Sequence, residues 1–134
     1  MTSAKGENRA RRVPPVHLYT TRGEFAALLV YPYLYSRDGD WVGWVSDERD
    51  VFNLEGGYVG WVSHDRRILR RATAQPRIIP PPPSKPEETR VRVPATTPLP
   101  PLMAEYSHDV IDVLEEMPEL LHPLDSSELK SDMD

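Results

Sequence analysis

The sequence predicts a mainly β protein, an array of three to four β-hairpins followed by a proline-rich extended linker and a short C-terminal α-helix. Three observations lead to this fold class. A 17-residue repeat between residues 34 and 63 carries glycine and tryptophan at fixed positions, ten prolines fall between residues 76 and 101, and apolar residues recur at helical spacing after residue 107.

The first residues are predicted to form a disordered basic arm over 1–15, because four lysines and arginines precede a pair of prolines without any apolar run. No stretch of the sequence approaches the roughly 20 apolar residues that span a bilayer. The chain also has no cysteines. Since a small secreted domain ordinarily needs disulfides, we expect a cytoplasmic protein without a membrane segment.

The repeat aligns residues 34–46 with residues 51–63, and six of the thirteen aligned pairs are identical. These pairs are Gly39/Gly56, Val42/Val59, Gly43/Gly60, Trp44/Trp61, Val45/Val62 and Ser46/Ser63. In each unit two β-prone stretches flank a glycine-containing turn, which is the pattern of a β-hairpin whose turn needs a positive φ at Gly39 or Gly56. We assign residues 16–75 to this tandem hairpin module.

The second strand of each unit carries an internal glycine, Gly43 or Gly60, which is costly unless something approaches the backbone closely. We expect this neighbour to be an aromatic ring from the next hairpin. Strict strand alternation would place Trp41 and Trp44 on opposite faces of the sheet.

Partial matches to the repeat unit at residues 18–25 and at Ile68–Leu69 extend the array to as many as four hairpins. Terminal units of an array are often degenerate because one of their faces has no neighbour. Residues 24–29 contain good helix formers, so a short helix there is an alternative to a hairpin strand.

The run Leu-Tyr…Asp-Gly-Asp-Trp-Val-Gly-Trp-Val at 34–45, the run Val-Phe…Gly-Gly-Tyr-Val-Gly-Trp-Val at 51–62 and the run at 66–70 resemble the four-fold beta-flower proteins. These are small bacterial domains of four β-hairpins arranged like petals. The resemblance covers about residues 16–71. It implies a β-flower fold, and it brings no established activity, cofactor or active-site residue.

The proline-rich stretch is assigned to a linker over 76–101. Such a segment cannot form helix or internal sheet and is predicted to extend as polyproline II. A spacer is the simplest role, and a ligand for an aromatic-lined receptor groove is the alternative.

The segment 102–123 is predicted to be amphipathic and acidic, with a helix over 107–116 whose apolar stripe includes Val110, Leu114 and Met117. Because an isolated helix of this length is marginal, we expect the stripe to dock on its own module or on a partner. Residues 124–134 are predicted to be a disordered acidic tail.

Charge is distributed unevenly: residues 64–92 carry net +5 and residues 102–134 carry net −9. The basic segment includes Arg66, Arg67, Arg70 and Arg71. Beside the aromatic residues of the hairpins, these arginines make single-stranded nucleic-acid binding an alternative function.

No catalytic constellation is assembled in the sequence, which lacks a phosphate-binding glycine loop and a nucleophile elbow. His108 and Asp112 stand four residues apart, but two ligands fall short of a zinc site. We therefore predict a non-catalytic scaffold or protein-interaction module without metal or cofactor, which binds an unknown protein partner or associates with itself. Nucleic-acid binding is the alternative, and an enzyme is the third reading.

Overall fold

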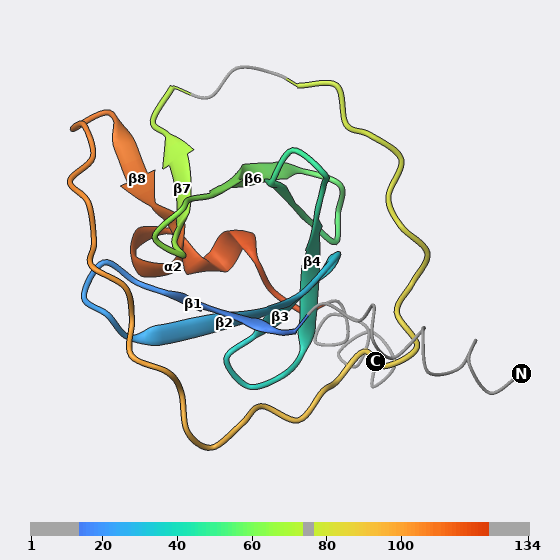
Figure 1. Ribbon diagram of the computed structural model, residues 1–134. Coiled ribbons are helices and arrows are strands. Elements are labelled where there is room, and N and C mark those ends of the chain that lie inside the picture. The colour runs from blue at the N-terminus through green and yellow to red at the C-terminus, as the bar shows by residue number, and fades with distance from the viewer. Residues whose placement is uncertain (1–13, 74–76, 124–134) are drawn as a thin grey trace, which may run out of the picture.

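We describe a computed structural model of the chain, in which residues 14–73 and 77–123 are placed. Eight strands form one antiparallel sheet in the order β1 to β8, so that strands consecutive in the sequence are also neighbours in space. The sheet curls around a central axis (Figure 1). The strands are β1 (Val16–Tyr19), β2 (Phe25–Val30), β3 (Tyr33–Ser36), β4 (Trp41–Val45), β5 (Asp50–Asn53), β6 (Tyr58–Val62), β7 (Ile68–Arg71) and β8 (Val110–Asp112).

The strands pair as four hairpins, β1–β2, β3–β4, β5–β6 and β7–β8, which we number first to fourth. The first three turn at Gly23, Gly39 and Gly56, whose φ angles are +86°, +94° and +88°. Glycine adopts this left-handed conformation without steric cost, which is why the turns form there. The mainly β fold and the predicted hairpins are confirmed.

Residues 25–30 form the strand β2 rather than the alternative helix. Leu29 lies between Val16 of β1 and Leu34 of β3, so the segment pairs on both of its edges. The hydrogen bonds and burial of a central strand outweigh the local helix propensity of its alanines and leucines.

A β-bulge recurs in the first three hairpins. In the second hairpin Leu34 pairs with Gly43 and Tyr35 with Trp41, which leaves Val42 as the extra residue. The bulge shifts the phase of the strand. Val42 and Val45 therefore both enter the core, and the expectation that Trp41 and Trp44 lie on opposite faces was wrong, because both line one pocket outside the core.

The core fills the inside of the curled sheet with aliphatic side chains from every hairpin. Repeat-equivalent positions in the four first strands supply Leu18, Leu34, Val51 and Ile68, each fully buried. Burial of side chains of this kind contributes roughly 1.5–3 kcal/mol each. The same position of the repeat unit thus supplies a buried core residue in all four hairpins.

Glycine is required at positions 43 and 60 because the main chain of the next hairpin passes close to these residues. A Cβ atom at Gly43 would lie 2.4 Å from the carbonyl oxygen of Phe52, and one at Gly60 would lie 2.1 Å from that of Leu69. The neighbour is therefore the backbone of the next hairpin, and the expectation of an aromatic ring was wrong.

The predicted short C-terminal helix is confirmed, but its predicted range 107–116 was wrong. Residues Val110–Asp112 form β8, which pairs with β7, and the helix α2 covers only Val113–Glu116 before the 3-10 helix η1 (Pro118–Leu120). The edge of β7 offers unpaired backbone groups, and β-branched residues such as Val110 and Ile111 suit a strand. The segment 102–123 is thus part of the sheet domain, and the module does not end at residue 75.

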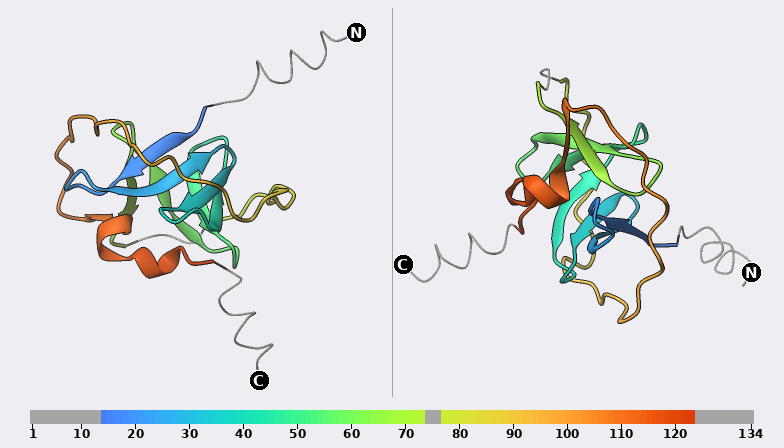
Figure 2. Two further views of the ribbon diagram at one scale, coloured as in Figure 1. Left: turned by 90° about the horizontal axis from the view of Figure 1, so that it is seen from below. Right: turned by 90° about the vertical axis from the view of Figure 1, so that its left-hand side faces the viewer.

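The short helices lie across one end of the curled sheet (Figure 2). Val113 is fully buried in the core, and Leu114, Met117, Leu120 and Leu121 pack against it. The apolar stripe predicted for this segment therefore docks on its own module.

The proline-rich segment is the connection inside the fourth hairpin. We call residues 77–109 the strap. It leaves the region of β7, runs around the outside of the sheet past the third, second and first hairpins, and returns to β8 (Figure 1). The predicted linker over 76–101 is thus not a spacer between two parts, since both of its ends are held by neighbouring strands.

The predicted arm over 1–15 and the predicted tail over 124–134 fall outside the described residues, apart from positions 14 and 15. Within the described ranges, no helix has the length and apolar character needed to cross a membrane.

Candidate peptide-binding surface

Aromatic side chains gather on the outer face of the first three hairpins, where the bulges turn them away from the core. We call this set the aromatic band. Its members are Tyr19, Tyr33, Tyr35, Trp41, Trp44, Phe52, Tyr58 and Trp61. Trp44 stacks on Phe52 with ring centroids 4.6 Å apart, Phe52 meets Tyr58 edge-on at 5.9 Å, and Tyr33 meets Trp41 at 6.4 Å. Contacts of this geometry fix the orientation of the rings.

Tyrosine hydroxyls of the band donate hydrogen bonds to backbone carbonyls of the strap. The Tyr33 hydroxyl reaches the carbonyl of Ser84 at 2.6 Å and the Tyr35 hydroxyl that of Glu88 at 3.0 Å. On the first hairpin, the Tyr19 hydroxyl reaches the carbonyl of Pro98 at 2.7 Å. Burial raises the pKa of Tyr19 and of Tyr35, so both phenols remain protonated donors.

Backbone contacts tie the strap to the turn of the second hairpin as well. The amide of Trp41 donates to the carbonyl of Thr89, and the amide of Val91 donates to that of Gly39, each at 2.8 Å. A Cβ atom at Gly39 would lie 2.1 Å from the carbonyl oxygen of Val91. The strap is therefore seated directly on this turn.

Two pockets of the band occupy equivalent places in the repeat. The second-hairpin pocket, of about 380 Å³, is lined by Trp41, Trp44, Leu54 and Gly56 among others. A shift of 17 residues converts these four positions into Tyr58, Trp61, Arg71 and Thr73, which line the third-hairpin pocket of about 440 Å³. The structure thus contains two aromatic pockets at equivalent positions of the repeat.

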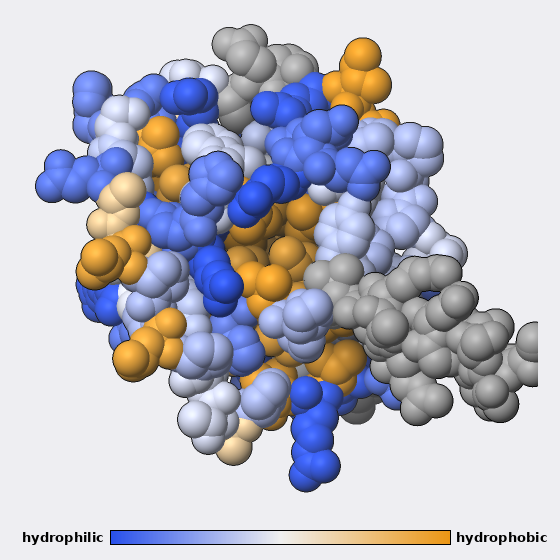
Figure 3. Space-filling model, viewed as in Figure 1, coloured by the Kyte–Doolittle hydropathy of each residue, from blue (hydrophilic) through white to orange (hydrophobic). Residues whose placement is uncertain are grey.

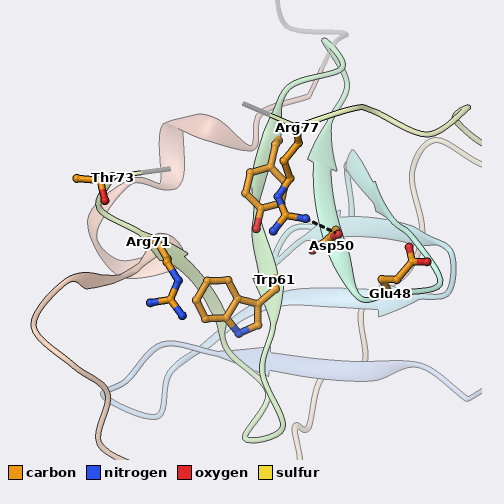
Figure 4. Close-up of a pocket in the computed structure, with 7 residues that line it drawn as sticks. Glu48, Asp50, Trp61, Arg71, Thr73 and Arg77 are labelled. Atoms are coloured by element: carbon orange, nitrogen blue, oxygen red, sulfur yellow. Dashed lines mark hydrogen bonds and ion pairs between the residues drawn. The ribbon is translucent and has the colours of Figure 1, made fainter. Parts of the chain in front are cut away.

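The strap distinguishes the two pockets. In the second-hairpin pocket Ile79, Pro82 and Pro83 of the strap form part of the lining. In the third-hairpin pocket the described part of the strap contributes only Arg77 (Figure 4). Prolines of the described strap thus line the second-hairpin pocket and not its equivalent.

The third-hairpin pocket has balanced charge. The Arg77 guanidinium lies 2.8 Å from the Asp50 carboxylate and 4.3 Å from the centre of the Tyr58 ring, whose pKa is raised by burial. The Arg71 guanidinium lies 5.7 Å from the centre of the Trp61 ring, and Glu48 adds a second carboxylate. Cation–π contacts of this kind orient the arginine side chains over the rings. The pocket therefore combines two aromatic rings, each with an arginine over one face, and its lining carries no net formal charge.

The four arginines predicted to form a basic patch have different surroundings. Arg67 is 1% exposed, and Arg70 donates hydrogen bonds to the carbonyls of Tyr58 and Val59. Arg66 and Arg71 are exposed.

Arg67 joins the two ends of the curled sheet. Its guanidinium lies 2.5 Å from Asp65 and also donates to Thr21 and to the carbonyl of Ala104. Burial alone would raise the pKa of Asp65, but hydrogen bonds from Arg67, Ser63 and the Ala104 amide outweigh it and lower this pKa to about 2. Thr21 in turn donates to Asp112 of β8. This network connects the first and fourth hairpins, so the hydrogen-bonding groups of Arg67, Asp65 and Thr21 are engaged in stabilising the fold.

The remaining residues singled out from the sequence have structural positions. Gly39 and Gly56 form turns, Gly43 and Gly60 allow the strand contacts, and Trp44 is buried against Phe52. Val110 lies in β8, and Leu114 and Met117 pack on the core. Among the described residues, no group of three or more His, Cys, Asp or Glu side chains is placed to hold a metal ion.

The tyrosines that hold the strap were not recognised from the sequence as a site. A signal was present, because the equivalent positions read Tyr19, Tyr35, Phe52 and Leu69 along the four units. A hydroxyl is found at the first two, where the strap receives a hydrogen bond, and not at the last two.

Comparison with known proteins gives one match. A family model described as 4-fold beta flower protein matches residues 16–114, a range that includes all eight strands and the whole strap. No curated protein and no solved structure matches the chain.

Proposed function

The chain belongs to the 4-fold beta flower protein family, and we propose that this member is a non-catalytic protein-interaction module whose aromatic band binds an extended, proline-rich segment. The observation that carries the proposal is the seating of the strap on the band. Pro82 and Pro83 line one pocket together with Trp41 and Trp44. The hydroxyls of Tyr33 and Tyr35 donate to the carbonyls of Ser84 and Glu88, which follow the proline run in the strap.

This mode of recognition suits proline-rich ligands in particular. A polyproline II segment has no internal hydrogen bonds, so its carbonyls are available to donors such as tyrosine hydroxyls. It is also extended before it binds, which keeps the entropic cost of association low. The band supplies both the flat apolar faces and the donors that such a segment needs.

The third-hairpin pocket is the place where a segment from outside would bind. It has the same aromatic frame as the second-hairpin pocket, and no proline of the described strap lines it. Asp50 and Phe52 stand where Tyr33 and Tyr35 hold the strap, so the donors offered to a ligand here are the Tyr58 hydroxyl and the Arg71 guanidinium. The alternative of nucleic-acid binding has less support, because Arg67 is buried and Arg70 is engaged with backbone carbonyls. A cytoplasmic setting is part of the proposal, since a small domain without disulfides is typical of that compartment.

Titration with a synthetic polyproline peptide, followed through the indole N–H signals of the three tryptophans by NMR, tests the proposal. We expect a saturable shift that is largest for Trp61. A glycine-serine peptide of the same length is the control and should leave the signals unchanged. Equal responses to both peptides, or no response to either, would contradict the proposal.

A further inference from the structure

The strap contains two proline runs, but only one of them lines an aromatic pocket. The run 80–83 reaches the second-hairpin pocket through Pro82 and Pro83. The run that includes Pro98, Pro100 and Pro101 lines neither pocket of the band. Within residues 14–73 and 77–123, one proline run of the strap thus lines neither pocket, and no proline lines the third-hairpin pocket.

The second run displays apolar side chains to solvent. Leu99 is 90% exposed and Leu102 is 97% exposed, and apolar residues stand out along the path of the strap in the space-filling view (Figure 3). Large apolar side chains gathered at the surface typically mark an interaction site.

Anchors hold this segment in place on both sides. The carbonyl of Pro98 accepts the hydrogen bond of Tyr19, and Ala104 is held through its amide by Asp65 and through its carbonyl by Arg67. Pro100 lies beside the turn at Gly23. The leucines therefore project from a segment that is already extended, which lowers the entropy lost on binding.

The segment and the third-hairpin pocket match in chemistry. Residues 93–104 contain no charged side chain, and the two arginines and two carboxylates of the pocket sum to zero formal charge. In the equivalent pocket, prolines of the strap form part of the wall beside the same aromatic frame. A neutral proline-leucine segment therefore suits the remaining pocket.

The two parts cannot meet within one copy while the strap keeps its contacts. Tyr19 ties the segment to the first hairpin, whereas the pocket is lined by residues of the third and fourth hairpins. We propose that residues 98–102 of one copy bind the third-hairpin pocket of a second copy. This inference rests on the proposed function, and it makes the partner another copy of the chain.

An interface of this kind joins two different surfaces. Unless two copies exchange their segments reciprocally, it leaves a segment and a pocket unused at the ends of every chain of copies. Such head-to-tail contacts give rings or open chains rather than closed two-fold dimers. Association should therefore continue beyond the dimer as concentration rises, with little dependence on salt because the matching surfaces carry no net charge.

Size-exclusion chromatography with light scattering on the full chain tests this. The wild type should show a mass that increases with concentration. Trp61→Ala removes a wall of the pocket, and the double change Leu99→Ser with Leu102→Ser removes the apolar side chains of the segment. We expect each variant alone to be monomeric, with association weakened at least tenfold.

Mixing the two variants gives the sharpest result. The Trp61→Ala copy retains its segment and the double variant retains its pocket, so an equimolar mixture should form a dimer and no larger species. The control is Ile78→Ser, because Ile78 is 96% exposed and lies on the strap outside the segment. This variant should associate like the wild type.

A synthetic peptide of residues 96–104 provides a test that needs no variant. It should dissolve the wild-type oligomer and shift the Trp61 indole signal. A wild type that stays monomeric while the peptide still binds would overturn the self-association and leave the proposed function standing. A monomeric wild type that binds neither this peptide nor polyproline would overturn both the self-association and the proposed function. An oligomer that persists in both variants would overturn the proposed contact between residues 98–102 and the third-hairpin pocket.

Discussion

The second and third hairpins are identical at six of thirteen aligned positions and have the same bulged backbone, yet the strap lies against the turn of only one of them. At Gly39 a Cβ atom would meet the strap backbone, whereas at Gly56 nothing lies within 4 Å. The positions that hold the strap differ between the two units. Tyr35 and Asp40 bond to Glu88 and Arg90, and the equivalent residues are Phe52 and Gly57.

This difference shows how a repeat can acquire two roles. The positions that build the scaffold, such as the core valines and the strand glycines, are the same in both units. A few outward positions decide whether a unit receives the chain's own strap. The duplicated frame therefore supplies one pocket whose wall includes prolines of the strap and one to which the described strap contributes only Arg77.

The largest effect is expected where the two hairpins are alike. Gly43→Val and Gly60→Val should each destabilise the protein by about 3 kcal/mol, at the upper end of overpacking, because a side chain would overlap the main chain of the next hairpin. Thermal unfolding of both variants measures this. A melting temperature that stays unchanged in either variant would show that the strand contact is not required.

A smaller effect should separate the two turns. Gly56→Ala is expected to cost about 1–2 kcal/mol, because alanine at positive φ is strained. Gly39→Ala has the same strain and should cost about 1 kcal/mol more, because its Cβ also displaces the backbone at Val91. Denaturant unfolding of the two variants compares them directly, and equal losses would mean that the strap adds no stability at the second hairpin.

The sequence allowed the hairpins and their turns to be predicted, because glycine at fixed repeat positions has a local physical reason. It did not allow β8 to be predicted. Three residues of strand follow a long proline-rich segment, and their partner is the distant edge of β7, so the local pattern of Val110, Ile111 and Leu114 resembled an amphipathic helix.

The geometry of the candidate site could not be predicted from the sequence for a different reason. The rings of Trp41 and Trp44 were assigned to opposite faces because strand alternation does not reveal a bulge. The incomplete fourth unit held a clue, since Ile68–Leu69 starts a hairpin whose second strand is missing nearby. The next β-branched run after the prolines is the one that forms β8.

The smallest effect concerns a single hydroxyl group. Tyr35→Phe makes the second hairpin resemble the third, where Phe52 stands at the same position, and removes the hydrogen bond to the carbonyl of Glu88. We expect a cost of about 1 kcal/mol, since Glu88 is exposed and water can replace the lost donor. Amide exchange at Val91, which bonds to Gly39, should become about fivefold faster as the strap loosens. Tyr31→Phe serves as the control, because the Tyr31 hydroxyl bonds to Asp47 rather than to the strap. If Val91 exchanges at the same rate in both variants, the tyrosine hydroxyl does not decide which hairpin holds the strap, and the proline contacts with Trp41 and Trp44 must do so.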